Sequence, residues 1–121
     1  PRSCALKKER LTRWGNNLCV KGTQMAKGYW VANVEVQDMD IYKNYVAGNG
    51  EVFAKYGARF VTRGGKHQVK EGQVNSRVVV IEFKDYETAL ACYESPEYQA
   101  LKAIRLPAAT SNLAIVEGWD G

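Results

Sequence analysis

Short apolar runs, several of them alternating with polar residues, predict four β-strands along the chain. The first run is typical of a strand with two different sides, since Trp30 and Val34 fall on one side and Val31 on the other. Residues 78–83 are almost entirely apolar and rich in β-branched side chains, and they give the strongest strand signal. In chain order, the predicted strands cover residues 29–36, 59–63, 78–83 and 112–117.

A turn signal after the second predicted strand indicates one more hairpin. Gly64-Gly65 is typical of a tight turn, and the residues that follow it, 66–71, are predicted to form a return strand. Residues 72–76 are mostly polar and predict a loop before the next strand.

The spacing of apolar residues predicts two helical regions between the strands. Asp38 is a typical N-cap residue and Gly57 suits the left-handed position that closes a helix, so the first helix lies between them. The second region begins near Asp85, restarts at Ser95-Pro96 and ends near Pro107. The predicted buried face of the first helix consists of Ile41, Tyr45, Gly48, Val52 and Tyr56.

The resulting order of elements, βαββαβ, predicts an α+β fold. Because crossover connections are right-handed, both helical regions are expected on one face of a four-stranded antiparallel sheet, which is the ferredoxin-like arrangement. The chain has 121 residues, which is enough for one such domain and leaves no room for a second.

The face of the sheet opposite the helices is predicted to be apolar as well. In the third strand, Val79 and Ile81 point to one side while Val78 and Val80 point to the other. A monomer rarely exposes a contiguous apolar surface of that size. We therefore predict a homodimer that forms sheet to sheet through a two-fold contact. The alternative is that another part of the same chain, such as its first 24 residues, covers this face.

Charge divides the chain into two parts. Residues 1–24 hold six of the 17 basic residues and one of the 13 acidic ones, so the other 11 basic and 12 acidic residues give the rest of the chain a net charge of −1. Regular patterning begins at Met25. We interpret residues 25–121 as the folded domain and residues 1–24 as a basic N-terminal extension that is not native or not part of the core. The alternative is a basic arm that docks on an acidic or nucleic-acid partner.

Composition favours a cytoplasmic protein. No apolar run approaches the roughly 20 residues that a membrane-spanning helix needs, and the start of the chain lacks the apolar stretch of a secretory signal. The three cysteines, Cys4, Cys19 and Cys92, are too few for a disulfide framework and suit a reducing compartment. Cys92 lies in a predicted helix and is expected to be a small buried apolar residue.

Five short motifs stand out between residues 26 and 118. They are KGYWVA (27–32), FAKYGARF (53–60), RGG (63–65), ACY (91–93) and SPEYQ (95–99). Together they resemble the bacterial domain of unknown function 1330 family. The resemblance implies a ferredoxin-like fold within the dimeric α/β-barrel superfamily, which also contains small cofactor-free monooxygenases and isomerases. It brings no known reaction and no catalytic residues.

His67 is the single histidine of the chain and is the candidate catalytic acid or base, because its ordinary pKa lies near neutrality. It follows Arg63 and the Gly64-Gly65 turn, and such a loop can hold an anionic ligand through the arginine and backbone N–H groups. A histidine beside a hairpin is also commonly an inert surface residue, and a tight hairpin by itself requires the paired glycines. Both interpretations stay open.

Two glycines inside the first helix predict a pocket between this helix and the sheet. Gly48 and Gly50 each lower helix stability by about 1 kcal/mol relative to alanine, which favours close backbone packing on the sheet, a kink or room for a ligand. Tyr45, Tyr42 and Asn33 are the predicted polar lining, together with Arg63 as a substrate-binding residue. Asn33 interrupts an apolar strand, and the alternative is that it faces the dimer contact or solvent.

The sequence contains no recognisable metal-ligand set, phosphate-binding loop or dinucleotide-binding motif, so we predict neither a metal nor a cofactor. The leading prediction is a homodimer that binds a small organic molecule, either as an enzyme that relies on the substrate's own reactivity or as a non-catalytic binding module. An RNA-binding module is a further alternative, because such modules share the βαββαβ order. It is disfavoured by valines where stacking aromatics are required and by the negative charge of the domain.

Overall fold

The computed structural model describes residues 26–120 of the chain. Its elements are, in chain order, β1 (Gly28–Val36), α1 (Met39–Lys55), β2 (Arg59–Arg63), β3 (Arg77–Phe83), α2 (Tyr86–Glu94), α3 (Pro96–Arg105) and β4 (Ala109–Glu117). The predicted order βαββαβ is confirmed, with the second helical region divided into two helices. The predicted basic extension, residues 1–24, lies outside the described residues.

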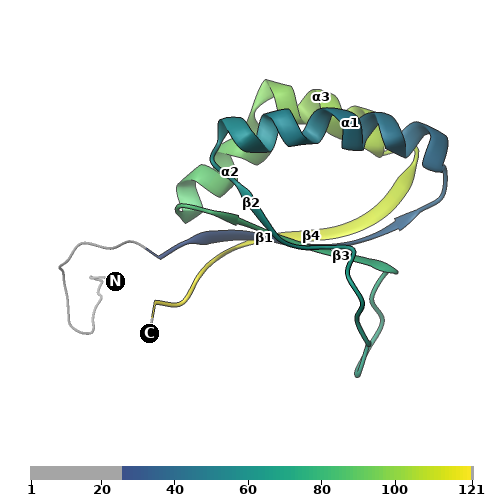
Figure 1. The fold of residues 1–121 in the computed structure, drawn as a ribbon, viewed down its shortest axis with the longest axis horizontal. Coiled ribbons are helices and arrows are strands. Elements are labelled where there is room, and N and C mark those ends of the chain that lie inside the picture. Colours follow the sequence, from purple (N-terminus) through teal and green to yellow (C-terminus); the bar gives the residue numbers. More distant parts are fainter. Residues whose placement is uncertain (1–25, 121) are drawn as a thin grey trace.

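The four strands form one antiparallel sheet in the order β2-β3-β1-β4. All three helices lie on one face of the sheet, and the connection between β2 and β3 projects on the opposite side (Figure 1). This is the ferredoxin-like arrangement that the sequence predicts.

Alternate residues of the central strands divide between the two faces. We call the face beneath the helices the covered face. There, Trp30 and Ile81 keep only 1% and 4% of their surface exposed. On the opposite face, the open face, Val31 keeps 43% of its surface exposed, and Val78 and Val80 are half-buried. The predicted sidedness of the first and third strands is therefore confirmed.

Trp30 is the centre of the core beneath the helices. Its ring lies edge-on to the rings of Phe53, Tyr93 and Tyr98, at centroid separations of 5.1, 5.7 and 4.9 Å. Its indole N–H donates to the carbonyl oxygen of Ala89 at 2.9 Å. Because these neighbours belong to α1, α2 and α3, one side chain of β1 connects all three helices to the sheet.

The first helix begins and ends where the sequence predicts, but its buried face differs. The Asp38 side chain caps it by accepting the N–H of Ile41 at 3.2 Å, and Gly57 follows it at a φ of 69°. The predicted buried face is wrong at its start, because Ile41 keeps 36% of its surface exposed. The helix is rotated so that larger aromatic rings meet the sheet. Its buried residues are Tyr42, Tyr45, Asn49 and Phe53.

Ser95 and Pro96 separate α2 from α3. The Ser95 hydroxyl donates to the Cys92 carbonyl at 2.8 Å and accepts the N–H of Tyr98 at 3.1 Å, so it ends one helix and caps the next. Pro96 stands in the first turn of α3, where its missing N–H would have no helical partner. This break places the fully buried Tyr98 against Trp30.

One predicted strand is absent, and the first residue of another was predicted incorrectly. Residues 66–71 form no return strand, because β2 pairs directly with β3 and the connection between them, residues 64–76, extends away from the sheet and has no neighbouring strand (Figure 1). The last strand begins at Ala109 rather than at residue 112, because Thr110 and Ser111 continue the ladder opposite β1.

Gly48 and Gly50 occupy different environments in α1. A Cβ atom on Gly48 would lie 2.6 Å from Cδ2 of Leu101 in α3, whereas one on Gly50 would have nothing within 4 Å. Close packing of two helices therefore explains Gly48. No contact in the structure explains Gly50.

We expect Gly50→Ala to raise the free energy of unfolding by about 1 kcal/mol, because alanine favours the helix and meets no neighbour there. Gly48→Ala should gain less, because Leu101 has to move to admit the methyl group. Urea denaturation followed by circular dichroism, at one fixed protein concentration, measures both variants. Equal gains would contradict the packing explanation.

Candidate functional site

A pocket lies between α1, α3 and the covered face of the sheet. It contains about 530 Å³ of space between atoms, its open mouth included. Its apolar walls come from α1 and all four strands, and they consist of Trp30, Ala32, Val34, Val46, Phe53, Phe60, Val79, Ile81 and Leu113. Mostly apolar walls with a few polar groups are typical of sites for small organic molecules.

Two tyrosine hydroxyl groups meet at this pocket. The Oη atoms of Tyr45 in α1 and Tyr98 in α3 lie 2.9 Å apart, at hydrogen-bonding distance, and the two side chains keep only 7% and 0% of their surface exposed. Burial raises the pKa of Tyr45 far above its ordinary value of 10.0 and also raises the pKa of Tyr98, although the positive charge of Arg105 opposes both shifts. Both phenols therefore keep their protons at neutral pH.

Arg105 stands in the last turn of α3 and keeps 6% of its surface exposed. Its Nη1 donates to the hydroxyl of Ser111 in β4. Its guanidinium carbon lies 5.7 Å from the centre of the Tyr45 ring. The arginine therefore places a positive charge beside the tyrosine pair.

Arg63 reaches the pocket because β2 is irregular. Phe60 pairs with Ile81 of β3. Arg63, three residues later, pairs with Val79, only two residues from Ile81, so β2 contains one extra residue, a β-bulge. Side chains alternate between faces along a strand, so the extra residue turns Arg63 from the open face to the covered face. There its guanidinium carbon lies 4.2 Å from the centre of the Phe60 ring.

A third arginine, Arg77, begins β3 and also lines the pocket. It lies close to Gly64, since a Cβ atom on that glycine would be 2.6 Å from Nη1 of Arg77. Gly64 has a φ of 71°, a conformation that glycine adopts readily. The turn after β2 therefore leaves room for the arginine.

Three buried polar atoms of the pocket residues have no hydrogen-bond partner among the described residues. They are Asn49 Oδ1, Arg77 Nε and Arg105 Nε. Asn49 keeps only 5% of its surface exposed. Buried polar atoms are destabilising when unpaired, so these three atoms are an uncompensated feature of the pocket.

Three of the predicted site residues come together here. Tyr42, Tyr45 and Arg63 all line the pocket, Tyr42 and Tyr45 from successive turns of α1 and Arg63 from the edge strand. The predicted position of the pocket, between the first helix and the sheet, is where the structure has it.

The structure places Asn33 away from the pocket, on the open face. Its Oδ1 accepts the backbone N–H of Asn75 at 3.0 Å and the side-chain N–H of Asn112 at 3.2 Å. Its position follows from alternation, because Ala32 and Val34 on either side of it point to the covered face.

The structure also separates His67 from the pocket. His67 is exposed on the connection between β2 and β3, with Nδ1 3.1 Å from the carbonyl oxygen of Gly65, and it is not a lining residue. A role for it as a catalytic acid or base stays a prediction.

Five polar contributors to the pocket were not predicted: Asn49, Arg77, Tyr98, Arg105 and Ser111. A signal for two of them exists in the sequence. Asn49 stands seven residues after Tyr42, and Arg105 seven residues after Tyr98, so each continues the helix face that begins with a buried tyrosine. A polar or charged residue on such a face indicates a buried polar site.

Other chemistry is limited in the part of the chain that the structure describes. Residues 26–120 contain no group of three or more His, Cys, Asp or Glu side chains that could hold a metal ion. Burial raises the pKa of Cys92 to about 12, so it remains a thiol, as expected for a buried apolar position.

None of the described helices combines the length and the hydrophobicity needed to span a membrane.

Residues 27–119 match a family described as a domain of unknown function, DUF1330. The chain belongs to the DUF1330 family. The resemblance that the five sequence motifs carry is thereby confirmed. No curated protein matches the sequence.

Solved structures share the fold of this DUF1330 chain. A protein of unknown function from Rhodopseudomonas palustris is 17% identical, with a TM-score of 0.63 over 80% of this chain and 85% of that one. A dimeric ferredoxin-like protein of unknown function from Thermobifida fusca is 15% identical, with a TM-score of 0.54 over 79% and 94%. SnoaB, a cofactor-independent oxygenase from Streptomyces nogalater, is 14% identical, with a TM-score of 0.57 over 79% and 96%. At these identities the likeness establishes the ferredoxin-like fold alone.

The free energy of unfolding is expected to fall as the pH rises above 10, because Tyr45 and Tyr98 hold their protons more tightly in the folded chain than in the unfolded one. Raised pKa values contribute stability that is complete below the unfolded value and is lost above it, at up to about 1.4 kcal/mol per pH unit for each group. Tyr45→Phe should make the decline shallower. Urea denaturation between about pH 9 and pH 11 measures the slopes.

Tyr86→Phe is the matched control, because Tyr86 is half-buried and does not line the pocket. It should keep the slope of the unsubstituted protein. A decline of the same steepness in Tyr45→Phe would contradict the assignment of the effect to the tyrosine pair.

Proposed function

We propose that this protein is a homodimer that binds a small organic molecule in the pocket between α1, α3 and the sheet. One observation carries the ligand-binding part: the pocket combines aromatic and aliphatic walls with buried polar atoms that lack partners within the described residues. An ordinary core fills such a space with apolar side chains or pairs its polar atoms. Tyr42, Tyr45 and Arg63 are the binding residues that the sequence predicts, and Tyr98, Asn49 and Arg105 join them.

The same pocket fits a cofactor-independent enzyme in one respect. Tyr45 and Tyr98 stay protonated, so they can donate hydrogen bonds to an oxygen atom on which negative charge develops. Neither phenol is a proton acceptor of suitable pKa near neutral pH, so a reaction here would depend on a substrate that is reactive by itself. SnoaB, which shares the fold, is described as a cofactor-independent oxygenase.

The apolar part of the open face supports the homodimer. Val31 and Val116 keep 43% and 45% of their surface exposed on neighbouring strands, and Val78 and Val80 lie beside them in β3. Covering such a surface is favourable by about 25 cal/mol for each Å² removed from water. A second copy of the chain offers a matching apolar surface through a two-fold contact. The Thermobifida fusca protein with this fold is described as dimeric.

Two polar side chains of the open face, Asn33 and Glu82, already have partners in the same chain. Asn33 is bonded to Asn75 and Asn112. The Glu82 carboxylate accepts from Arg59 Nη2 at 2.6 Å, which helps to hold its pKa below the ordinary value. A partner sheet can therefore cover this face without leaving these polar groups unpaired, which is the usual penalty for burying them.

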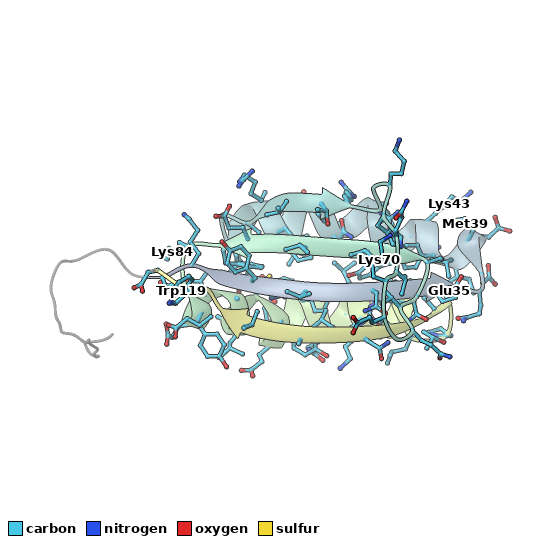
Figure 2. The ribbon with its side chains drawn as sticks, turned by 90° about the horizontal axis from the view of Figure 1, so that it is seen from below. Glu35, Met39, Lys43, Lys70, Lys84 and Trp119 are labelled. Atoms are coloured by element: carbon cyan, nitrogen blue, oxygen red, sulfur yellow. The ribbon has the colours of Figure 1, made fainter. Side chains whose placement is uncertain are left out.

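Two projecting segments border the open face. Figure 2 looks onto this face, with Lys70 of the connection between β2 and β3 near one end and Trp119 near the other. Val69 and Val74 on the connection keep 44% and 40% of their surface exposed, and Trp119 keeps 92%. A partner sheet seated between the two segments would cover these side chains as well.

The RNA-binding alternative finds less support. The central strands β1 and β3 present valines and Asn33 on the open face, with Tyr29 as their aromatic residue, whereas RNA-recognition modules stack bases on aromatics there. The negative charge of the domain also disfavours binding of a polyanion such as RNA.

We place the protein in the cytoplasm, where a reducing environment suits the buried thiol of Cys92.

A ligand in the pocket should move the nuclear magnetic resonance signal of the Trp30 indole N–H, because this ring forms part of the wall. A screen of small organic compounds against the full ¹⁵N-labelled chain should yield compounds that shift the Trp30 signal and leave the signal of the exposed Trp119 unchanged. Absence of any compound with that pattern would contradict the proposed pocket. Mass spectrometry of each bound compound after incubation in air then distinguishes an enzyme, which converts it, from a binding module, which returns it unchanged.

The unsubstituted chain should sediment at twice its mass of 13.5 kDa. The double variant Val31→Asp, Val80→Asp should sediment as a monomer, because these residues pair directly across β1 and β3 and would bring two carboxylates into the contact. Met39→Asp is the control, since Met39 is 58% exposed at the start of α1, and it should remain dimeric. Analytical ultracentrifugation measures all three, with circular dichroism to establish folding. A monomeric unsubstituted chain at micromolar concentration would refute the dimer.

A further inference from the structure

Arg105 carries a positive charge in a deeply buried position, with 6% of its surface exposed. Removing a guanidinium group from water is strongly unfavourable unless a counter-charge or a full set of hydrogen bonds compensates. Its neighbours are neutral hydroxyl groups, since it donates to Ser111 and interacts with Tyr98, and its Nε has no partner. No carboxylate of residues 26–120 forms an ion pair with it.

The other residues that line the pocket also supply more hydrogen-bond donors than acceptors. Arg63 and Arg77 also line it, and no aspartate or glutamate is among the described lining residues. Arginine side chains donate hydrogen bonds and accept none. In the Tyr45–Tyr98 pair one hydroxyl donates to the other, which leaves one O–H donor to spare. The pocket therefore presents several donors, and Asn49 Oδ1 is its unpaired acceptor.

The strand register separates the charged end of the pocket from its aromatic end. Val34 pairs with Arg77 on one side and with Ser111, the partner of Arg105, on the other. Trp30, four residues earlier in β1, pairs with Ile81 and Ile115. Four residues of strand are about 13 Å long. One end of the pocket is thus cationic, and the other is aromatic and aliphatic.

We infer that the ligand of this pocket is an organic carboxylate with a flat apolar body, bound with its carboxylate between Arg77 and Arg105 and its body toward Trp30. This inference rests on the proposed function and specifies its ligand class. A planar carboxylate with a single charge matches the fork of a guanidinium group, and the apolar walls suit a flat hydrocarbon body. A hydroxyl or N–H group on that body would supply the donor that Asn49 Oδ1 lacks.

Isothermal titration calorimetry of the full chain with three related compounds tests the inference. The probes are 2-naphthoate, its neutral counterpart 2-naphthamide, and 2-naphthyl phosphate. We expect 2-naphthoate to bind with a dissociation constant of about 1 mM or lower, at least tenfold more tightly than 2-naphthamide. Equal or tighter binding of the amide would overturn the inference, and so would tighter binding of the phosphate or no binding of the acid up to about 10 mM.

Failure of the inference is distinguishable from failure of the proposed function. If 2-naphthamide binds as well as 2-naphthoate and shifts the Trp30 signal, the pocket still binds small molecules but does not select a carboxylate. If no compound in a broad screen shifts that signal, the proposed function itself fails.

Charge-removing variants locate the carboxylate. Arg105→Met should weaken binding of 2-naphthoate at least tenfold and leave binding of 2-naphthamide unchanged, because it removes a charge and keeps an apolar side chain. Lys43→Met, which removes one positive charge from an exposed position on α1, should leave both affinities unchanged. Equal weakening for acid and amide in Arg105→Met would indicate a merely structural role and overturn the assignment. If Arg105→Met does not fold, Arg77→Met provides the same comparison.

Discussion

The packing of Trp30 against all three helices is the interaction on which the rest of the structure depends. Its indole N–H is bonded to α2, and its ring contacts aromatic side chains of α1, α2 and α3. This contact fixes the height of the helices above the sheet at one end of β1. Toward the other end, α1 and α3 present Tyr42, Asn49 and Arg105 instead of a continuous apolar surface, and the space between helices and sheet remains partly unfilled. The core and the pocket are thus two ends of one layer.

The two faces of the sheet have different roles because strand residues alternate. Even-numbered residues of β1 build the core and the pocket, while odd-numbered ones form the open face. On the open face Asn33 and Glu82 are bonded within the chain, and the valines make up its apolar part. The pocket and this apolar surface therefore use separate sets of side chains on the same strands.

Much of the fold could be predicted from the sequence because local signals agree with it. The caps at Asp38 and Ser95, the glycine at residue 57 and the apolar run of β3 each specify an element boundary on their own. The predicted strand at residues 66–71 was wrong because a strand needs a neighbour, and neither residue type nor spacing shows that one is missing. The predicted buried face of α1 was wrong at Ile41, because the helix instead turns the larger rings of Tyr42 and Phe53 toward the sheet.

The site was predictable only in part, for a related reason. Tyr42, Tyr45 and Arg63 were identified as residue types suited to binding, but the side of the sheet on which Asn33 lies depends on register. Arg77 and Arg105 join the pocket from segments far apart in the sequence, and a charged residue at such a position is ordinarily expected in solvent. Only the packed chain reveals that Arg77 lines the same pocket as Arg105.

The extra residue in β2 has a consequence for how sequences of this kind can change. It decides whether the Arg63 side chain lies on the covered face or on the open face, since removal of one residue between Phe60 and Arg63 would exchange the two. Such a deletion would withdraw a cation from the pocket and, in the same event, place it beside the valines of the open face. The length of this short strand therefore sets the charge of both faces of the sheet at once.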